Sequence, residues 1–189
     1  MSLSEGEERT GFLASYSPLF GVGAFAFLKL PEPWALRMVP EPPECDLLGA
    51  QSPRGGFRWV VKGRLKALLV NEEVEESTYL LKVETRVFSK ASDAEKFLVK
   101  RFRKLEEKSG SKVVEKGIVT VSGHEASYMV LISREKPIFG RERTKYLIEM
   151  AFFCDKTRRL LWIEVMGGPK LLEDAKTLVL IISSLSCHG

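Results

Sequence analysis

The segment from Thr144 to Cys187 constrains the fold more than any other part of this chain. Two strand-like runs, 144–154 and 159–166, are separated by a short polar turn, which is typical of a β-hairpin. Gly167-Gly168-Pro169 follows and places a proline at the first position of a helix, 169–185, whose apolar residues recur at helical spacing. The segment therefore predicts a β-hairpin covered by a helix that folds back over it.

Apolar periodicity predicts further elements before this hairpin. The expected strands are 24–30, 57–61, 64–70, 78–88, 112–121 and 126–133, and the expected helix is 92–108. Ser92 and Glu95 have the spacing of a capping box at the start of that helix. Residues 40–56 are rich in proline and glycine, and we expect them to form a connecting loop. Ser122-Gly123-His124-Glu125 predicts a tight turn between the two strands around it.

An α+β fold is the simplest closure of this element order, with an antiparallel β-sheet flanked by helices. Residues 1–10 are polar and are expected to be a flexible N-terminus, and 11–189 a single α+β domain. The order, together with Phe27-Leu28-Lys29-Leu30-Pro31-Glu32-Pro33-Trp34, resembles the PsbP and Mog1 proteins. In those proteins an early strand ends in a proline and a tryptophan, a glycine-containing turn joins two middle strands, and a helix ends the chain. The resemblance covers 24–186 and implies an α/β/α sandwich with a binding or assembly role, and it transfers no binding residue.

Composition excludes a disordered chain, because 44% of the residues are hydrophobic and 29% are charged. The uncharged stretch from Gly11 to Leu28 follows acidic residues and contains Pro18, Gly21 and Gly23, so a membrane span or signal segment is not expected. We therefore expect a cytoplasmic protein that does not bind membranes.

Amide side chains are nearly absent, with one asparagine, Asn71, and one glutamine, Gln51. This bias, with abundant lysine, arginine and glutamate, is typical of proteins from very hot environments and indicates a thermophilic, archaeal source. The net charge of +4 is too small to imply nucleic-acid binding by itself.

The cysteines give one geometric prediction. The second strand of the hairpin runs away from its turn and the last helix runs back, so Cys187 should lie near Cys154. The pair could form a disulfide, remain as two buried thiols or, least expected, join His188 in a metal or redox site. Cys45, in the proline-rich loop, could replace either partner. No metal site and no cofactor are predicted, because His188 is adjacent to Cys187 and His124 is expected on a distant, exposed turn.

Two glutamates form the strongest catalytic candidate. The hairpin register places Glu149 opposite Glu164, and two opposed carboxylates raise one pKa, as acid–base catalysis requires. Alternatively, a basic residue on a neighbouring strand, namely Lys82, Arg86 or Arg134, neutralises the pair, or one of the two glutamates faces outward. No third catalytic residue can be identified, so a non-enzymatic role is favoured.

The connection from 134 to 143 is the predicted binding surface. Its candidate contact residues are Arg134, Lys136, Phe139, Arg141 and Arg143. These cations could bind an anionic group while the aromatic ring stacks on a base or fills a partner's pocket. A protein or small-ligand partner is favoured, and a nucleic acid that also contacts the basic face of helix 92–108 is the alternative. The oligomeric state is not indicated.

Overall fold

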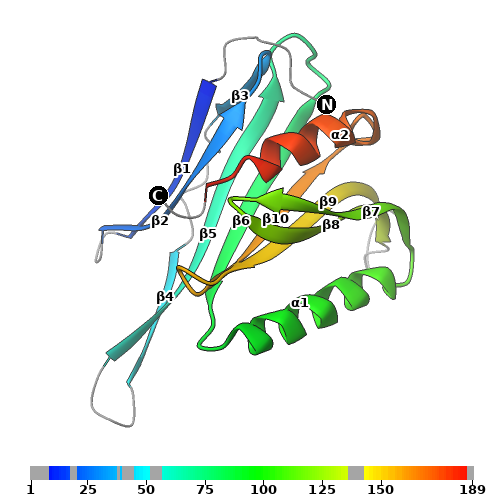
Figure 1. The fold of residues 1–189 in the computed structure, drawn as a ribbon. Helices are drawn as coiled ribbons and strands as arrows, with labels where there is room; N and C mark the ends of the chain where they lie inside the picture. The colour runs from blue at the N-terminus through cyan, green and yellow to red at the C-terminus, as the bar shows by residue number, and fades with distance from the viewer. Residues whose placement is uncertain are drawn as a thin grey trace.

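The computed structural model describes the backbone of residues 9–17, 21–37, 39, 45–51, 57–135 and 143–186 (Figure 1). Its strands are β1 (Arg9–Ser17), β2 (Gly21–Leu30), β3 (Trp34–Arg37), β4 (Cys45–Gln51), β5 (Phe57–Asn71), β6 (Thr78–Val87), β7 (Ser111–Val121), β8 (His124–Glu135), β9 (Arg143–Cys154) and β10 (Arg159–Gly167). Its helices are α1 (Ala91–Glu106) and α2 (Leu171–Ser183).

Antiparallel pairing dominates the molecule, as the sequence predicts. The main sheet has eight strands in the order β3-β5-β6-β10-β9-β8-β7, and β4 pairs with β5 beside β3. β1 and β2 form a separate antiparallel hairpin. Strand β7 lies at one edge of the main sheet, and a bulge at Val114 interrupts its pairing with β8. The predicted α+β fold, an antiparallel sheet flanked by helices, is therefore confirmed.

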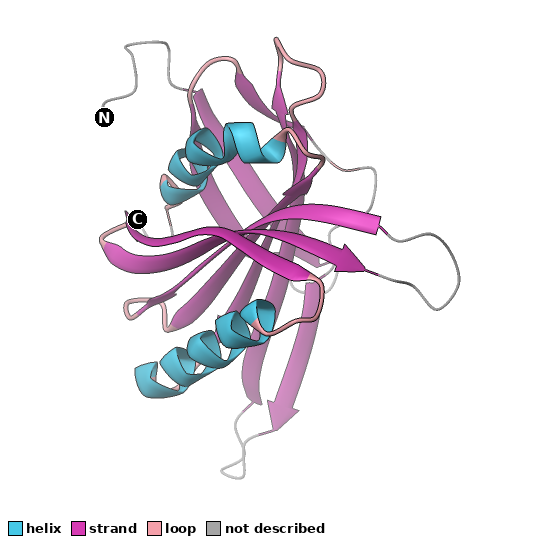
Figure 2. Cartoon of the chain, turned by 90° about the vertical axis from the view of Figure 1, so that its right-hand side faces the viewer, coloured by secondary structure: helices cyan, strands magenta, loops and turns pink. Residues whose placement is uncertain are grey.

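The two helices lie on opposite faces of the main sheet (Figure 2). Alternate residues of each strand face α2, where Leu81, Ile163 and Leu178 are part of the larger hydrophobic core. The other face packs against α1 through a smaller cluster that contains Ala94 and Trp162. The helix α2 therefore covers the β9–β10 hairpin, as the last segment of the sequence predicts.

The hairpin of β1 and β2 also belongs to the α2 side. Leu28 and Leu30 are buried in the larger core. The Ser184 hydroxyl accepts a hydrogen bond of 2.8 Å from the Lys29 amide, and a bridge joins Phe27 to Ser186. Most of the uncharged stretch 11–28 is thus strand, and Arg9 already pairs with Leu30 inside the range expected to be flexible. No helix in the described part of the chain has the length and apolarity needed to cross a membrane.

The proline-rich range 40–56 is not entirely irregular, contrary to the expectation of a loop. Strand β4 occupies the stretch between Pro43 and Pro53, where every residue keeps the amide that a β-ladder requires. The two strands expected at 57–61 and 64–70 are one strand, β5. Gly63 does not break it because its backbone pairs with β4 on one side and β6 on the other.

Both helix starts differ from the prediction. Helix α1 begins at Ala91, and its N-cap Lys90 makes no side-chain capping bond. Ser92 is already inside the helix, so the expected capping box does not form. Helix α2 begins at Leu171, two residues after Pro169, which lies in the turn before the helix.

Candidate functional site

A row of charged side chains crosses three adjacent strands on the α1 face of the sheet. The register pairs Glu149 of β9 with Glu164 of β10, as predicted, and pairs Glu164 with Lys82 of β6. Directly paired residues of antiparallel strands point to the same face. The two glutamates and the lysine therefore lie side by side beneath α1.

Ion pairs and one indole hold this row. The Lys82 ammonium donates to the Glu164 carboxylate at 2.9 Å, so Lys82 is the neutralising residue among the three that the sequence offered. The Trp162 indole N–H donates to the Glu149 carboxyl. From α1, the guanidinium of Arg101 lies 3.9 Å from the centre of the Trp162 ring and donates to Glu84 at 3.0 Å. The helix thus contributes a cation that stacks on the indole.

Glu149 is the most perturbed group in the row. Its side chain is almost entirely buried, with the residue only 3% exposed. Burial, and next the negative charge of Glu164, raise the pKa of Glu149 to about 8, although the Trp162 hydrogen bond and the charge of Arg101 oppose this. Glu149 therefore carries a proton at neutral pH, because ionisation would place a second buried charge beside Glu164.

A cavity of about 330 Å³ opens above the row, and we call it the Lys82 cavity. Its lining residues are Leu65, Lys66, Lys82, Glu84, Arg101, Trp162 and Glu164. Glu149 is outside this lining and lies behind Glu164. The lining has three basic and two acidic side chains. The cavity is within the size range of small-molecule sites and has a surplus of positive charge.

A shallow groove along α1 continues this positive surface. Its lining is Phe97, Lys100, Arg101, Lys104, Leu105, Glu107 and Lys108. Arg101 belongs to both the groove and the Lys82 cavity. The basic outer face that the sequence predicts for this helix is therefore present, and it adjoins the cavity.

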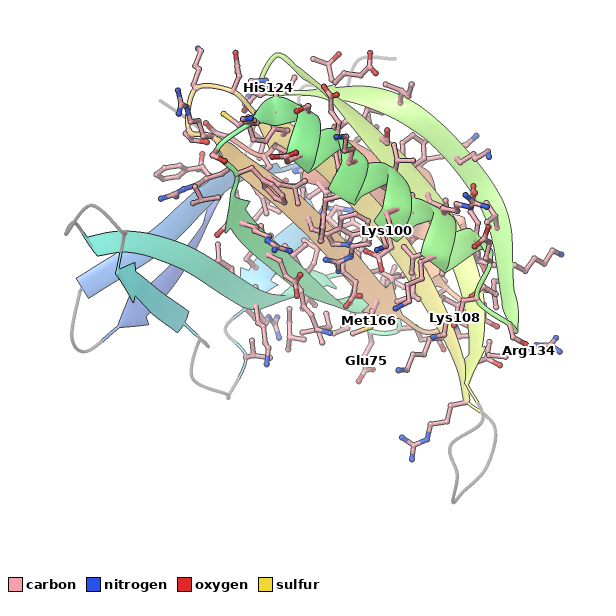
Figure 3. The ribbon with its side chains drawn as sticks, turned by 90° about the horizontal axis from the view of Figure 1, so that it is seen from below. Glu75, Lys100, Lys108, His124, Arg134 and Met166 are labelled. Carbon is pink, nitrogen blue, oxygen red and sulfur yellow. The ribbon has the colours of Figure 1, made fainter. Side chains whose placement is uncertain are left out.

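The predicted binding loop is described only at its two ends. Arg134 and Arg143 lie at the ends of β8 and β9, whereas Lys136, Phe139 and Arg141 lie outside the described residues. The Arg134 amide donates to the Gly110 carbonyl at 2.9 Å, which places Arg134 beside the C-terminal end of α1 and Lys108 (Figure 3). The contact role of the loop stays a prediction.

His124 is not at the exposed tip of a four-residue turn. The turn between β7 and β8 consists of Ser122 and Gly123 alone, with φ of 49° and 80°, and His124 is the first residue of β8. Its side chain is only 14% exposed, lies 3.6 Å from the Asp155 carboxylate, and stacks on Phe152 with ring centres 5.8 Å apart. The shorter turn returns the histidine to the sheet instead of exposing it.

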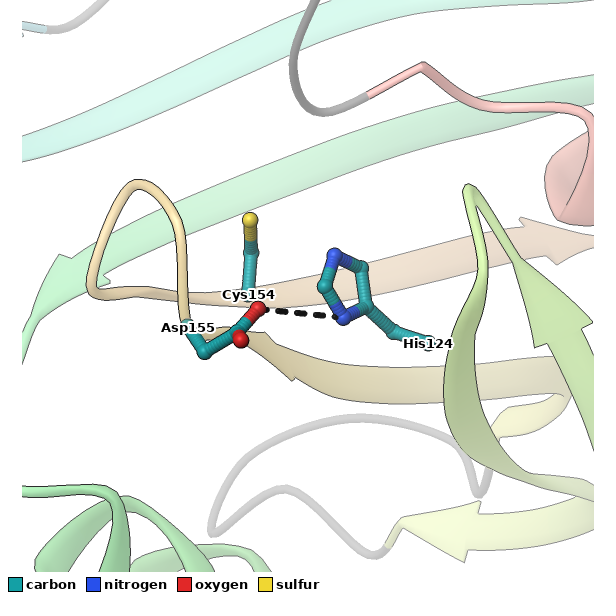
Figure 4. Close-up of side chains that lie close together, drawn as sticks. All are labelled: His124, Cys154 and Asp155. Carbon is teal, nitrogen blue, oxygen red and sulfur yellow. Dashed lines mark ion pairs between the residues drawn. The ribbon is translucent and has the colours of Figure 1, made fainter.

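Cys154 is fully buried at the end of β9, close to His124 and Asp155 (Figure 4). Cys187 lies outside the described residues, so its pairing with Cys154 stays a prediction. The expectation that His124 lies on a turn distant from Cys154 is wrong. The β8–β9 register, which pairs Ser127 with Ala151, brings the start of β8 level with the end of β9.

Comparison with known proteins gives similarity in structure only. No protein-family model and no curated protein matches the sequence. PA94 from Pseudomonas aeruginosa, a protein of unknown function with a suggested regulatory role, superposes with a TM-score of 0.49 at 10% identity, covering 95% of this chain and 99% of that one. The solution structure of the PsbP protein CyanoP from Synechocystis has a TM-score of 0.42 at 10% identity, covering 100% and 98%. A PsbP protein, from a family that the sequence resembles, is therefore among the similar folds.

Proposed function

We propose that this chain is a ligand-binding module that holds a small organic anion in the Lys82 cavity. The observation that supports it is the lining itself, in which three basic and two acidic side chains surround about 330 Å³ beneath α1. A concave site with a few convergent polar groups is the usual form of a small-molecule site. The surplus positive charge favours a carboxylate or a phosphate group over a cation.

Two cations of the lining, Lys82 and Arg101, retain hydrogen-bond donors for a ligand. A lysine ammonium has three N–H donors and an arginine guanidinium has five. Among the described residues, the bond from Lys82 to Glu164 uses one donor and the bond from Arg101 to Glu84 uses one. Stacking on Trp162 fixes the plane of the Arg101 guanidinium, and a fixed plane suits two parallel bonds to a carboxylate or phosphate.

Protonated Glu149 supports anion binding from behind the cavity wall. While the Glu149 carboxyl is neutral, the Glu149–Glu164 pair carries a single negative charge, on Glu164, which lines the cavity. As the pH rises through about 8, ionisation of Glu149 adds a second negative charge next to Glu164. Anion affinity should therefore fall over that range, and Glu149→Gln should abolish the fall.

An acid–base enzyme is the second candidate, and the raised pKa of Glu149 favours it. In that case Glu164, which lines the cavity, would contact the substrate, and Glu149 would supply or accept the proton through it. The two candidates differ in the fate of the bound molecule, because a binding module returns the molecule unchanged and an enzyme converts it.

Isothermal titration calorimetry with a panel of small carboxylates and organic phosphates tests the binding proposal at neutral pH. Lys82→Met, which keeps the length of the stem, should weaken binding at least tenfold. Lys116→Met is the matched control, because Lys116 is also a strand lysine paired with a glutamate, Glu106 at 3.1 Å, but lies outside the cavity. Equal effects of the two substitutions, or no binding of any anion by the unmodified protein, would contradict the proposal.

Two further readouts separate the alternatives. Mass spectrometry of a bound anion after prolonged incubation would detect a product only if the site is catalytic. A gel shift with an oligonucleotide that weakens with salt, in the absence of any small-anion binding, would favour the nucleic-acid interpretation.

A further inference from the structure

Three metal-ligating side chains converge where two turns meet, away from the Lys82 cavity. One ligand atom each from His124, Cys154 and Asp155 lies within 4.8 Å of the other two (Figure 4). His124 follows the β7–β8 turn, and the other two residues belong to the end of β9 and the turn after it. None of the three lines the Lys82 cavity.

We propose that these three residues bind a zinc ion. Thiolate and imidazole ligands favour zinc over calcium or magnesium, which take oxygen ligands almost exclusively. Two zinc ligands at tetrahedral angles are separated by about 3.4 to 3.6 Å, given the usual metal–ligand distances. The His124 Nδ1 and the Asp155 oxygen are already 3.6 Å apart. The three ligand atoms lie within 4.8 Å of one another, so metal binding requires the Cys154 sulfur to move closer to the other two.

The surrounding structure orients two of the ligands and leaves the third accessible. The Ser122 hydroxyl donates to the Leu185 carbonyl at 2.8 Å and so ties the turn before His124 to the segment that directly follows α2. The imidazole lies nearly parallel to the Phe152 ring, at an interplanar angle of 14°. Cys154 is fully buried, whereas the side chain of Asp155 is 77% exposed. The metal can therefore enter from the Asp155 side.

Charge balance is consistent with a divalent ion. On binding, the Cys154 thiol releases its proton to solvent and ligates as a thiolate, Asp155 ligates as a carboxylate, and His124 ligates as a neutral imidazole. The two negative charges then neutralise the zinc ion. Three protein ligands leave the fourth tetrahedral position for water or another donor.

Cobalt(II) substitution tests this site directly. In reduced protein freed of metal, one equivalent of cobalt should produce the near-ultraviolet charge-transfer absorption that a thiolate ligand gives, and added zinc should displace it. Cys154→Ser should abolish this absorption, while Cys45→Ser is the matched control and should retain it. Asp155→Asn, at an exposed position where folding should not be affected, should weaken zinc binding at least tenfold, an effect within the range seen for metal-site substitutions.

Three results would overturn the proposal. The first is the absence of thiolate–cobalt absorption in reduced protein, and the second is an absorption that persists in Cys154→Ser. The third is recovery of Cys154 as a disulfide with Cys187 in the protein as purified, because a cysteine in a disulfide cannot ligate zinc. Failure of the Lys82 cavity to bind anions would leave these measurements unaffected, since the two sites share no residue.

Discussion

Replacing Glu149 by glutamine should change how stability depends on pH. The substitution keeps the shape of a protonated glutamic acid, and the amide oxygen can still accept the hydrogen bond from Trp162. The amide nitrogen can donate toward Glu164, as a protonated carboxyl does. Glu149→Gln should therefore preserve the fold while removing a group that ionises.

The magnitude follows from the two pKa values of this carboxyl. In the unfolded chain Glu149 loses its proton near the ordinary pKa of 4.5, whereas in the folded chain it keeps the proton up to about 8. Between these values the unfolded state binds fewer protons, so stability decreases as the pH rises, by about 1.4 kcal/mol per pH unit. The stability that the protonated Glu149 carboxyl contributes is fully present below pH 4.5 and is lost once the pH has risen through about 8. The glutamine variant lacks this pH dependence. Above about pH 8, its unfolding free energy should be several kcal/mol larger than that of the unmodified protein.

Urea denaturation over the range from about pH 5 to about pH 9 measures the effect as the difference in unfolding free energy between the two proteins. Glu125→Gln, at an exposed position of β8, is the control and should give a constant difference. A difference between Glu149→Gln and the unmodified protein that does not grow with pH would refute the assignment of a proton to buried Glu149 at neutral pH.

Three other substitutions test a buried hydrogen bond, the core beneath α2 and the turn between β7 and β8. Tyr79→Phe should lower the unfolding free energy in chemical denaturation by about 1.5–3 kcal/mol, because the hydroxyl of buried Tyr79 donates to the Asp174 carboxylate at 2.6 Å. A loss near zero would show that this hydrogen bond is not stabilising. Leu178→Ala should lower the unfolding free energy by about 2–5 kcal/mol, because Leu178 is fully buried. Leu180 on the same helix is 45% exposed, so Leu180→Ala should change the unfolding free energy by no more than about 0.5 kcal/mol. Equal losses in the two variants would contradict the burial of the apolar stripe of α2. Gly123→Ala should lower thermal stability by about 1–2 kcal/mol, because its φ of 80° disfavours a side chain although no atom lies within 4 Å of the added carbon.

The parts of the site that depend on local pattern were predictable from the sequence. The turn between 155 and 158 fixes the register of β9 against β10, and so Glu149 was expected opposite Glu164, as the structure confirms. Which strand lies on the other side of β10 has no local signal, because that pairing closes a long stretch of chain. Lys82 was consequently one of three alternatives until the structure placed β6 beside β10.

Two contributions to the sites do not follow from the predicted elements alone. The first is Arg101, which is four residues after Phe97 and four before Leu105, within the buried stripe of α1. A charged residue on an apolar stripe was the available signal. The second is the proximity of His124 to Cys154, which depends on the β8–β9 register. The sequence does not show where β8 ends and β9 begins around the 134–143 connection, so this register could not be predicted.

The bulge at Val114 has a consequence for behaviour at high protein concentration. β7 is an edge strand, and an edge with a regular row of amides and carbonyls invites another chain to extend the sheet and begin aggregation. The extra residue interrupts that row and twists the strand, and the exposed Lys112 and Lys116 add repulsion between copies. At the opposite edge, β3 and β4 each cover only part of β5 and are short. Within the described residues, neither border of the sheet therefore offers a long, flat template, which should keep the folded chain from forming fibrils.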